Sequence, residues 1–87
     1  MSERKVSFTQ GGWEEYQYWL GQDKKTLKKI NKLIDEACRT PFTGSGKPEP
    51  LKENYVGYWS RRIDKQHRLI YPVSDSDITV VGCRFHY

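Results

Sequence analysis

The chain has 87 residues, which is enough for a single domain over residues 1–87 and too few for a second hydrophobic core. Its 15 lysines and arginines outnumber its 11 acidic residues, and the formal net charge of +4 favours a polyanionic partner. No apolar run approaches the ~20 residues that span a bilayer, and no signal-peptide pattern opens the chain, so we expect a cytoplasmic protein without a membrane partner.

The first half of the chain predicts a short strand and two helices. Residues 5–8 alternate as a strand does, and Thr9 can cap a helix over residues 10–22 whose first turn is weakened by two glycines. Asp23 can cap a second helix from Lys24 to about Thr40. Its lysine-rich face is interpreted as solvated rather than phosphate-binding, and its apolar stripe comprises Leu27, Ile30, Leu33, Ile34 and Ala37.

The second half predicts a connector followed by an antiparallel meander. Pro41 ends the helix, and residues 43–46 form a flexible link. Pro48 and Pro50 bracket Glu49, and the second proline keeps Glu49 extended with its carboxylate at the surface. Strands are expected at about 56–63, 67–73 and 78–86. The result is an α+β fold with both helices on one face of a mainly antiparallel sheet, which leaves the other face free for a ligand.

The two cysteines and two histidines are isolated from one another, and they lack the spacing of a metal site or a disulfide framework. Cys38 falls at the end of the second helix and Cys83 within an apolar strand. We therefore expect both cysteines to be buried, reduced thiols, and we expect neither a metal nor another cofactor.

The polar residues of the second half fit the chemistry of metal-independent RNA cleavage. RNA carries its own nucleophile, the 2′-hydroxyl, so a protein must supply a base, an acid and cations for the phosphate. Glu49 can act as the base, His86 as the acid and Arg68 as the phosphate clamp. Four further cations can hold the RNA backbone, and three aromatic residues can stack on bases: Lys47, Lys52, Arg61 and Arg62, and Tyr58, Trp59 and Tyr87.

Each of these assignments has a structural alternative. Glu49 fits an ordinary surface carboxylate, and Arg68 can instead pair with Asp64 or Asp77. His67, beside a turn, is interpreted as structural or exposed. If the last strand runs to the end of the chain, its final two side chains, His86 and Tyr87, point to opposite faces, so they can share a site only if the terminus turns. Trp59, Tyr71 and Phe85 are expected to pack in the core or across strands.

The whole chain resembles the YoeB (Txe) toxins of the RelE/ParE superfamily of type II toxin–antitoxin systems. Several blocks carry this resemblance in the same order and at compatible spacing: Trp13, Tyr16 and Trp19, then Lys29-Ile30-Asn31, Arg39-Thr40-Pro41-Phe42, Gly44-Ser45-Gly46-Lys47-Pro48-Glu49-Pro50-Leu51-Lys52, Gly57-Tyr58-Trp59-Ser60-Arg61-Arg62-Ile63, His67-Arg68-Leu69-Ile70-Tyr71 and Cys83-Arg84-Phe85-His86-Tyr87.

The resemblance implies a RelE-like fold and endonucleolytic cutting of mRNA in the ribosomal A site, which arrests translation. It implies that Glu49 is the general base, His86 the general acid, Arg68 the phosphate stabiliser and Tyr87 a residue that orients or stacks on the substrate. Lys52 and Arg62 match positions used around the scissile phosphate. The implied partners are a cognate antitoxin, the ribosome with its mRNA, a second copy in a homodimer, and operator DNA through the antitoxin complex alone.

Two other functions stay open at this stage. A gyrase-directed toxin of the same superfamily would need no nuclease residues, so the joint presence of Glu49, Arg68 and His86 counts against it. A non-enzymatic ribosome- or RNA-binding protein would need only the charge and the aromatic residues. Such a protein would inhibit translation by occupancy and leave the RNA intact.

Overall fold

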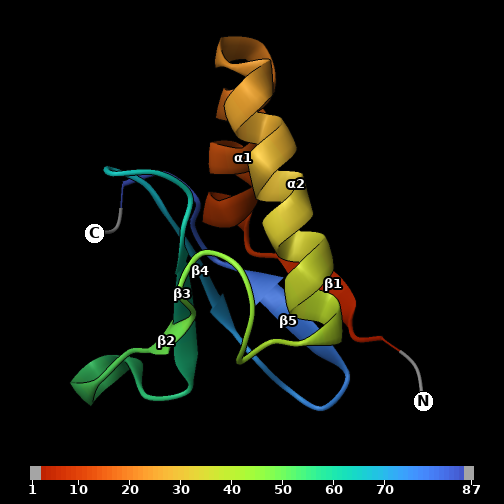
Figure 1. Ribbon diagram of the computed structural model, residues 1–87, viewed down its shortest axis with the longest axis vertical. Coiled ribbons are helices and arrows are strands. Elements are labelled where there is room, and N and C mark those ends of the chain that lie inside the picture. Colours follow the sequence, from red (N-terminus) through yellow and green to blue (C-terminus); the bar gives the residue numbers. More distant parts are fainter. Residues whose placement is uncertain (1–2, 86–87) are drawn as a thin grey trace.

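The computed structural model describes residues 3–85, which form two helices and five short strands (Figure 1). In chain order the elements are β1 (Lys5–Phe8), α1 (Gln10–Gln22), α2 (Lys24–Arg39), β2 (Glu49–Pro50), the 3₁₀ turn η1 (Glu53–Tyr55), β3 (Tyr58–Arg62), β4 (Arg68–Pro72) and β5 (Asp77–Val80). No helix in this range is both long and apolar enough to cross a membrane. The α+β class predicted from the sequence is confirmed.

Both helices begin at the predicted caps. The Thr9 hydroxyl accepts a hydrogen bond from the Gly12 N–H at 3.0 Å, which satisfies a donor of the first turn of α1. The Asp23 carboxylate accepts bonds from the N–H groups of Lys25 and Thr26 at 3.1 and 3.3 Å, and so caps α2. Hydrogen bonds from Thr26 to this carboxylate lower the pKa of Asp23. The polar residues at the helix starts therefore determine where each helix begins.

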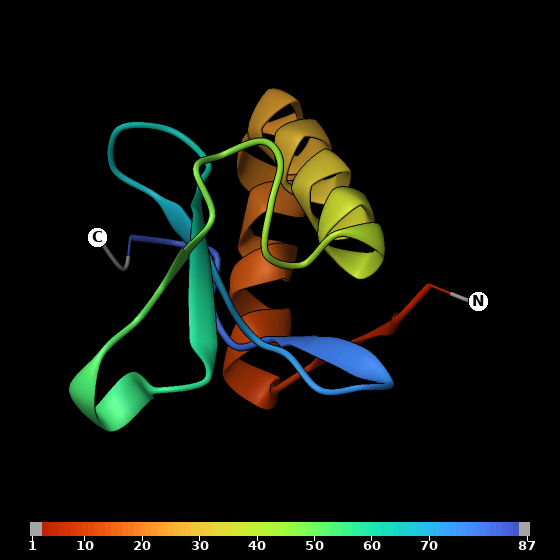
Figure 2. The same cartoon turned by 60° about the horizontal axis from the view of Figure 1, so that its bottom comes forward.

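The strands form an antiparallel sheet and a parallel pair. The antiparallel order is β2-β3-β4, with Ser60 opposite Ile70 and Glu49 opposite Ser60. Strands β1 and β5 pair in parallel, and single antiparallel bridges from Ile70 to Gly82 and from Val73 to Ile78 connect β4 with the β5 region. Figures 1 and 2 show the two helices side by side, with β2 and η1 lying away from them.

The last strand is shorter than predicted, because it ends at Val80 rather than continuing toward residue 86. The N–H groups of Cys83 and Arg84 donate to the Glu15 carboxylate of α1 at 2.8 and 3.0 Å instead of to a neighbouring strand. Phe85 then has a φ of 59°, outside the extended region. The Glu15 side chain of α1 thus takes the place of a strand partner for these two N–H groups, while the carbonyls of Gly82 and Phe85 still accept hydrogen bonds from Ile70 and Arg68 of β4.

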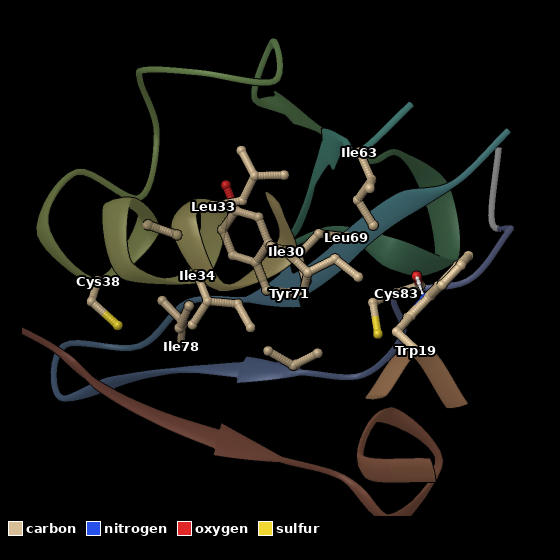
Figure 3. Packing of buried hydrophobic residues seen from close by; sticks show 12 residues of the cluster. Trp19, Ile30, Leu33, Ile34, Cys38, Ile63, Leu69, Tyr71, Ile78 and Cys83 are labelled. Carbon is tan, nitrogen blue, oxygen red and sulfur yellow. Dashed lines mark hydrogen bonds between the residues drawn. The ribbon is translucent and has the colours of Figure 1, made fainter. Parts of the chain in front are cut away.

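The core lies between α2, α1 and the sheet (Figure 3). Ile30 and Leu33 of α2 face Leu69 and Tyr71 of β4, and all four side chains are buried. On α1, Trp19 is buried, whereas Trp13 and Leu20 are exposed. Phe85 is 52% exposed and lies outside the strands, so the expectation that it packs in the core or across strands is wrong.

Both cysteines are buried, as predicted, and neither forms a disulfide. Burial raises the pKa of the Cys38 thiol, and burial together with the nearby Glu15 carboxylate raises the pKa of Cys83 to about 12. These thiols act as small apolar side chains of the core.

Candidate functional site

Strand alternation divides the polar residues of β3 between two faces of the sheet. Neighbouring side chains of a strand point to opposite faces, and directly paired residues point to the same face. Pairing of Glu49 with Ser60 and of Arg62 with Arg68 therefore places these four residues on one face. Arg61 points to the other face, where it contacts Glu36 of α2. The predicted base and the predicted phosphate clamp thus share the face that lies away from α2.

Glu49 and Arg68 form an ion pair on this face, although they are 19 residues apart in the sequence. Arg68 Nη1 lies 3.1 Å from Glu49 Oε1 and donates a second bond to the Ser60 hydroxyl at 3.3 Å. The Arg68 side chain is 21% exposed and that of Glu49 is 58% exposed. Asp64 and Asp77, the alternative partners for Arg68, instead accept hydrogen bonds from the Gln66 and His67 N–H groups and from the Ser74 hydroxyl. The arginine is held, whereas the carboxylate is open to a ligand.

Exposed cations flank this pair. Lys47 and Lys52 each lie two residues from an end of β2, and Arg62 lies at the end of β3 opposite Arg68. All three are exposed. Lys47 has a φ of 52°, so the chain turns just before β2 begins. The edge of the sheet therefore presents one carboxylate among several cations, a composition that suits a phosphodiester.

Arg61 was predicted to hold the RNA backbone, but its side chain is fully buried and faces α2. It uses all five of its guanidinium donors within the protein. The acceptors are the Tyr71 hydroxyl at 2.8 Å, Glu36 Oε1 at 2.7 Å, and the main-chain oxygens of Ser45, Thr40 and Thr43 at 3.1, 2.6 and 2.9 Å. No donor is left for a phosphate, so Arg61 holds the loop after α2 instead of binding RNA.

The same alternation separates the aromatic candidates. Tyr58 shares the face of Ser60 and Arg62, and its ring contacts Tyr55 in an edge-on arrangement with centroids 5.8 Å apart. Trp59 lies on the opposite face, where it is partly buried against the core and 4.8 Å from the Phe42 ring. Tyr58 is therefore the β3 aromatic residue on the same sheet face as the ion pair.

His86 and Tyr87 lie outside the described residues, and the chain leading to them is anchored to α1. Trp19 Nε1 donates to the Cys83 carbonyl at 2.9 Å, and Glu15 accepts the two N–H groups described above. Glu15 and Trp19 are four residues apart, so they share one face of α1. Sequence reasoning did not identify Glu15 or Ser60, because a lone carboxylate on a helix or a hydroxyl in a strand carries no distinctive pattern.

Known proteins are similar to this chain in sequence and in fold. The family model for YoeB-like toxins of bacterial type II toxin–antitoxin systems matches residues 8–87. The chain belongs to this family. Toxin YoeB of Synechocystis sp. is 53% identical over 83 residues, which cover 95% of this chain and 96% of the relative. Toxin YoeB of Escherichia coli K12 is 51% identical, and the match covers 95% of this chain and 99% of the relative.

Solved structures of family members extend the agreement to three dimensions. A YoeB/ParE toxin from Agrobacterium tumefaciens is 50% identical with a TM-score of 0.91, and the match covers 95% of this chain and 99% of that one. A YoeB dimer from Staphylococcus aureus is 42% identical with a TM-score of 0.90, covering 99% and 100%. In the YoeB–YefM complex from the same organism, the matching chain is 41% identical with a TM-score of 0.88, and the match covers 99% of this chain and 100% of that one. YafQ from E. coli is 17% identical with a TM-score of 0.73, and the match covers 97% of this chain and 94% of that one. At this identity, the likeness shows a shared fold alone.

Proposed function

We propose that this toxin is a ribosome-dependent mRNA endoribonuclease, an mRNA interferase that cuts mRNA in the ribosomal A site and so inhibits translation. The observation that carries the proposal is the Glu49–Arg68 ion pair, in which the carboxylate is exposed and exposed cations lie nearby in the fold. A general base and a phosphate clamp must meet at one phosphodiester, and in this fold they lie 3.1 Å apart.

The proposed mechanism is metal-independent attack of the 2′-oxygen on the adjacent phosphorus. Glu49 takes the proton of the 2′-hydroxyl as that oxygen forms its bond to phosphorus. Arg68 donates to the non-bridging phosphate oxygens, where negative charge grows in the transition state. His86 gives a proton to the departing 5′-oxygen, and Tyr87 orients the substrate. The products are a 2′,3′-cyclic phosphate and a 5′-hydroxyl.

The surrounding cations hold the RNA rather than react with it. Lys47, Lys52 and Arg62 are the proposed backbone contacts, and Tyr58 offers a ring on which a base can stack. Arg61 is left out of this set because its donors are all used internally. Such contacts position the RNA without reading its sequence, so codon choice must come from other groups.

The proposed partners follow from the family. A cognate antitoxin is expected to neutralise this chain, since a relative is known in complex with YefM, and a homodimer is expected since a relative forms one. Operator DNA is expected to bind only through the antitoxin complex. The ribosome supplies the mRNA substrate in its A site.

Primer extension on mRNA, with and without programmed ribosomes, tests the proposal. Cuts are expected only with ribosomes. Glu49→Gln and His86→Gln are each expected to lower the cleavage rate by about 10²–10⁴-fold while ribosome binding is kept, because they remove the proton-transferring group and leave a polar side chain in its place. Intact mRNA with tight ribosome binding would instead support a non-enzymatic inhibitor, and DNA damage without mRNA cuts would support a gyrase-directed toxin.

A charge-matched pair of variants separates the site from general basicity. Lys52→Gln and Lys32→Gln each remove one exposed positive charge, but Lys32 lies on α2 and Lys52 lies beside β2. We expect Lys52→Gln to weaken productive ribosome binding about 5-fold or more and Lys32→Gln to leave it unchanged. Equal effects of the two variants would mean that net charge, and not the proposed site, recruits the substrate.

A further inference from the structure

Phe85, the residue before His86, is bound through both of its main-chain polar groups. Its N–H donates to Nδ1 of His67 at 2.7 Å, and its carbonyl accepts the N–H of Arg68 at 2.8 Å. The residue before β4, His67, and the first residue of β4, Arg68, thus both bind one residue of the C-terminal segment. The first of them uses its side chain, and the second is the proposed phosphate clamp.

The His67 imidazole is itself held in place. It is buried, with a fractional exposure of 8%, and the Trp19 ring meets it edge-on with centroids 4.8 Å apart. The Phe85 ring lies 4.9 Å away on a tilted plane. The main chain of His67 is also held, because its main-chain N–H donates to Asp64 Oδ1 at 2.8 Å and its carbonyl accepts the Ile63 N–H at 2.9 Å. An acceptor fixed by so many contacts can determine the position of the peptide that it binds.

The bond also specifies the chemical form of the ring. Nδ1 accepts a hydrogen bond from an N–H group, so Nδ1 carries no proton, and the neutral ring has its N–H on Nε2. Phe85 has a φ of 59°, which a residue with a side chain rarely adopts. That conformation needs contacts to hold it. The hydrogen bonds with His67 and Arg68 supply them, because they fix the N–H on one side of the Phe85 Cα atom and the carbonyl on the other.

We propose that His67 is a positioning residue for the C-terminal part of the site. It acts through the main chain of Phe85, which directly precedes His86 in the sequence, and holds Phe85 at a fixed place relative to Arg68 without touching the RNA. The proposal rests on the proposed function, because a positioned terminus matters only if His86 takes part in cleavage. It assigns to His67 a role that its sequence context, beside a turn, did not reveal.

Three substitutions of His67 distinguish the contribution of its hydrogen-bond acceptor from that of its ring contacts. In His67→Asn, Oδ1 is bonded to Cγ as Nδ1 is, so an acceptor is kept near the same place. In His67→Phe, the ring contacts to Trp19 and Phe85 are kept and the acceptor is lost. His67→Leu has the branched shape of the Asn variant without an acceptor, and it replaces His67→Phe in the comparison if that variant does not fold.

Two measurements are made on each folded protein: hydrogen exchange of the Phe85 amide by NMR, and single-turnover mRNA cleavage on programmed ribosomes. In His67→Phe and His67→Leu we expect faster amide exchange and a cleavage rate at saturation at least 10-fold lower, with half-saturation unchanged, because misplacing a reacting group lowers the rate and not the binding. His67→Asn is expected to restore both measurements most of the way to wild type.

Three results would overturn the proposal. Wild-type cleavage by His67→Phe would show that the contact does not position the site, and an equal loss in His67→Asn would show that the ring and not its acceptor matters. Absence of ribosome-dependent cleavage by the wild-type protein would remove the proposed function and this role together. Even if the wild-type protein does not cleave, the exchange of the Phe85 amide still reports whether the contact with His67 exists. A failure of the proposed function is therefore distinguished from a failure of this contact.

Discussion

Ser60 is a buried hydroxyl in the middle of β3, and it accepts a hydrogen bond from the Arg68 guanidinium at 3.3 Å. Without the hydroxyl, Glu49 is the side-chain partner left to Arg68 among residues 3–85, so the guanidinium is less well held for the phosphate. One such bond contributes about 0.5–1.5 kcal/mol, which corresponds to roughly 2- to 10-fold in rate. We expect Ser60→Ala to lower the single-turnover cleavage rate by this factor. A loss as large as that of Arg68→Ala would mean that the substitution disturbs the sheet itself, which thermal unfolding would reveal.

The adjacent arginines of β3 show what could be predicted for single residues. The sequence identified Glu49 and Arg68 as chemical candidates, and the structure brings them together. It did not distinguish Arg61 from Arg62, because both carry the same charge in the same motif. Strand alternation makes the distinction, since Arg61 pairs with the buried Leu69 and Arg62 pairs with Arg68. That argument requires the register between β3 and β4, and turn residues alone did not specify the register.

Two neighbouring glycines in the first turn of α1 have opposite environments. A methyl group at Gly11 would meet no atom within 4 Å, whereas one at Gly12 would overlap the carbonyl of Val80 at the end of β5. Gly11→Ala is therefore expected to stabilise the protein by ~0.5–1 kcal/mol, because it reduces the freedom of the unfolded chain. Gly12→Ala is expected to destabilise it by ~1–3 kcal/mol, because α1 must move away from β5. Urea unfolding of the two variants measures both. Stabilisation by Gly12→Ala would contradict the close approach of the helix to the strand.

Glu36 links α2 to the loop after it, and this link depends on pH. The Ser45 N–H at 2.7 Å and the Arg61 guanidinium at the same distance lower the pKa of Glu36 below its ordinary value of 4.5. Because the folded protein binds this proton less tightly than the unfolded chain, the stabilisation is complete above about pH 4.5 and is lost as the pH falls through the lowered pKa. Glu36→Gln is expected to cost ~1–2 kcal/mol at pH 7 and progressively less below pH 4.

Urea unfolding of the wild-type protein and Glu36→Gln from pH 7 to pH 3 checks this expectation. Asp23 and Asp77 also have lowered pKa values, because of hydrogen bonds from Thr26 and from Ser74, and so they add to the acid sensitivity of both proteins. Their contribution cancels in the difference between the two. A difference that stays constant over this range would show that the Glu36 charge does not stabilise the fold.

The elements differ in how well their own residues specify them. Both helices have caps and apolar spacing within a few residues, and their starts at Gln10 and Lys24 match the prediction. Strand β2 has two residues and exists because Glu49 and Pro50 pair with β3, which no local pattern reveals. The end of β5 depends on Glu15, 68 residues before Cys83. Elements fixed by distant partners therefore lie beyond a reading of local sequence.

At the scale of the whole molecule, each helix holds one part of the proposed site. Helix α1 binds the C-terminal segment through Glu15 and Trp19. Helix α2 binds the loop that leads to Lys47 and Glu49, through Glu36 and its contact with Arg61. The sheet carries Arg68 between these two anchored segments. Loops and chain ends are usually the most mobile parts of a small domain, whereas here Ser45 of the loop after α2 is bonded to α2, and Cys83 and Arg84 are bonded to α1.

Thiol labelling tests whether the C-terminal segment opens alone or only with the whole fold. Cys38 lies in α2 and Cys83 in the anchored segment, and both are buried. Because the pKa of Cys83 is raised to about 12, roughly one molecule in 10⁴ carries its thiolate at pH 8.

We expect an aromatic disulfide reagent to leave both thiols unmodified in the native protein. In urea we expect both to react over the same transition as the loss of helical circular dichroism, since a domain of this size unfolds as one unit. Mass spectrometry of the labelled peptides distinguishes the two cysteines. Labelling of Cys83 before Cys38, at urea concentrations where the helices persist, would show that the Glu15 and Trp19 contacts break independently of the core.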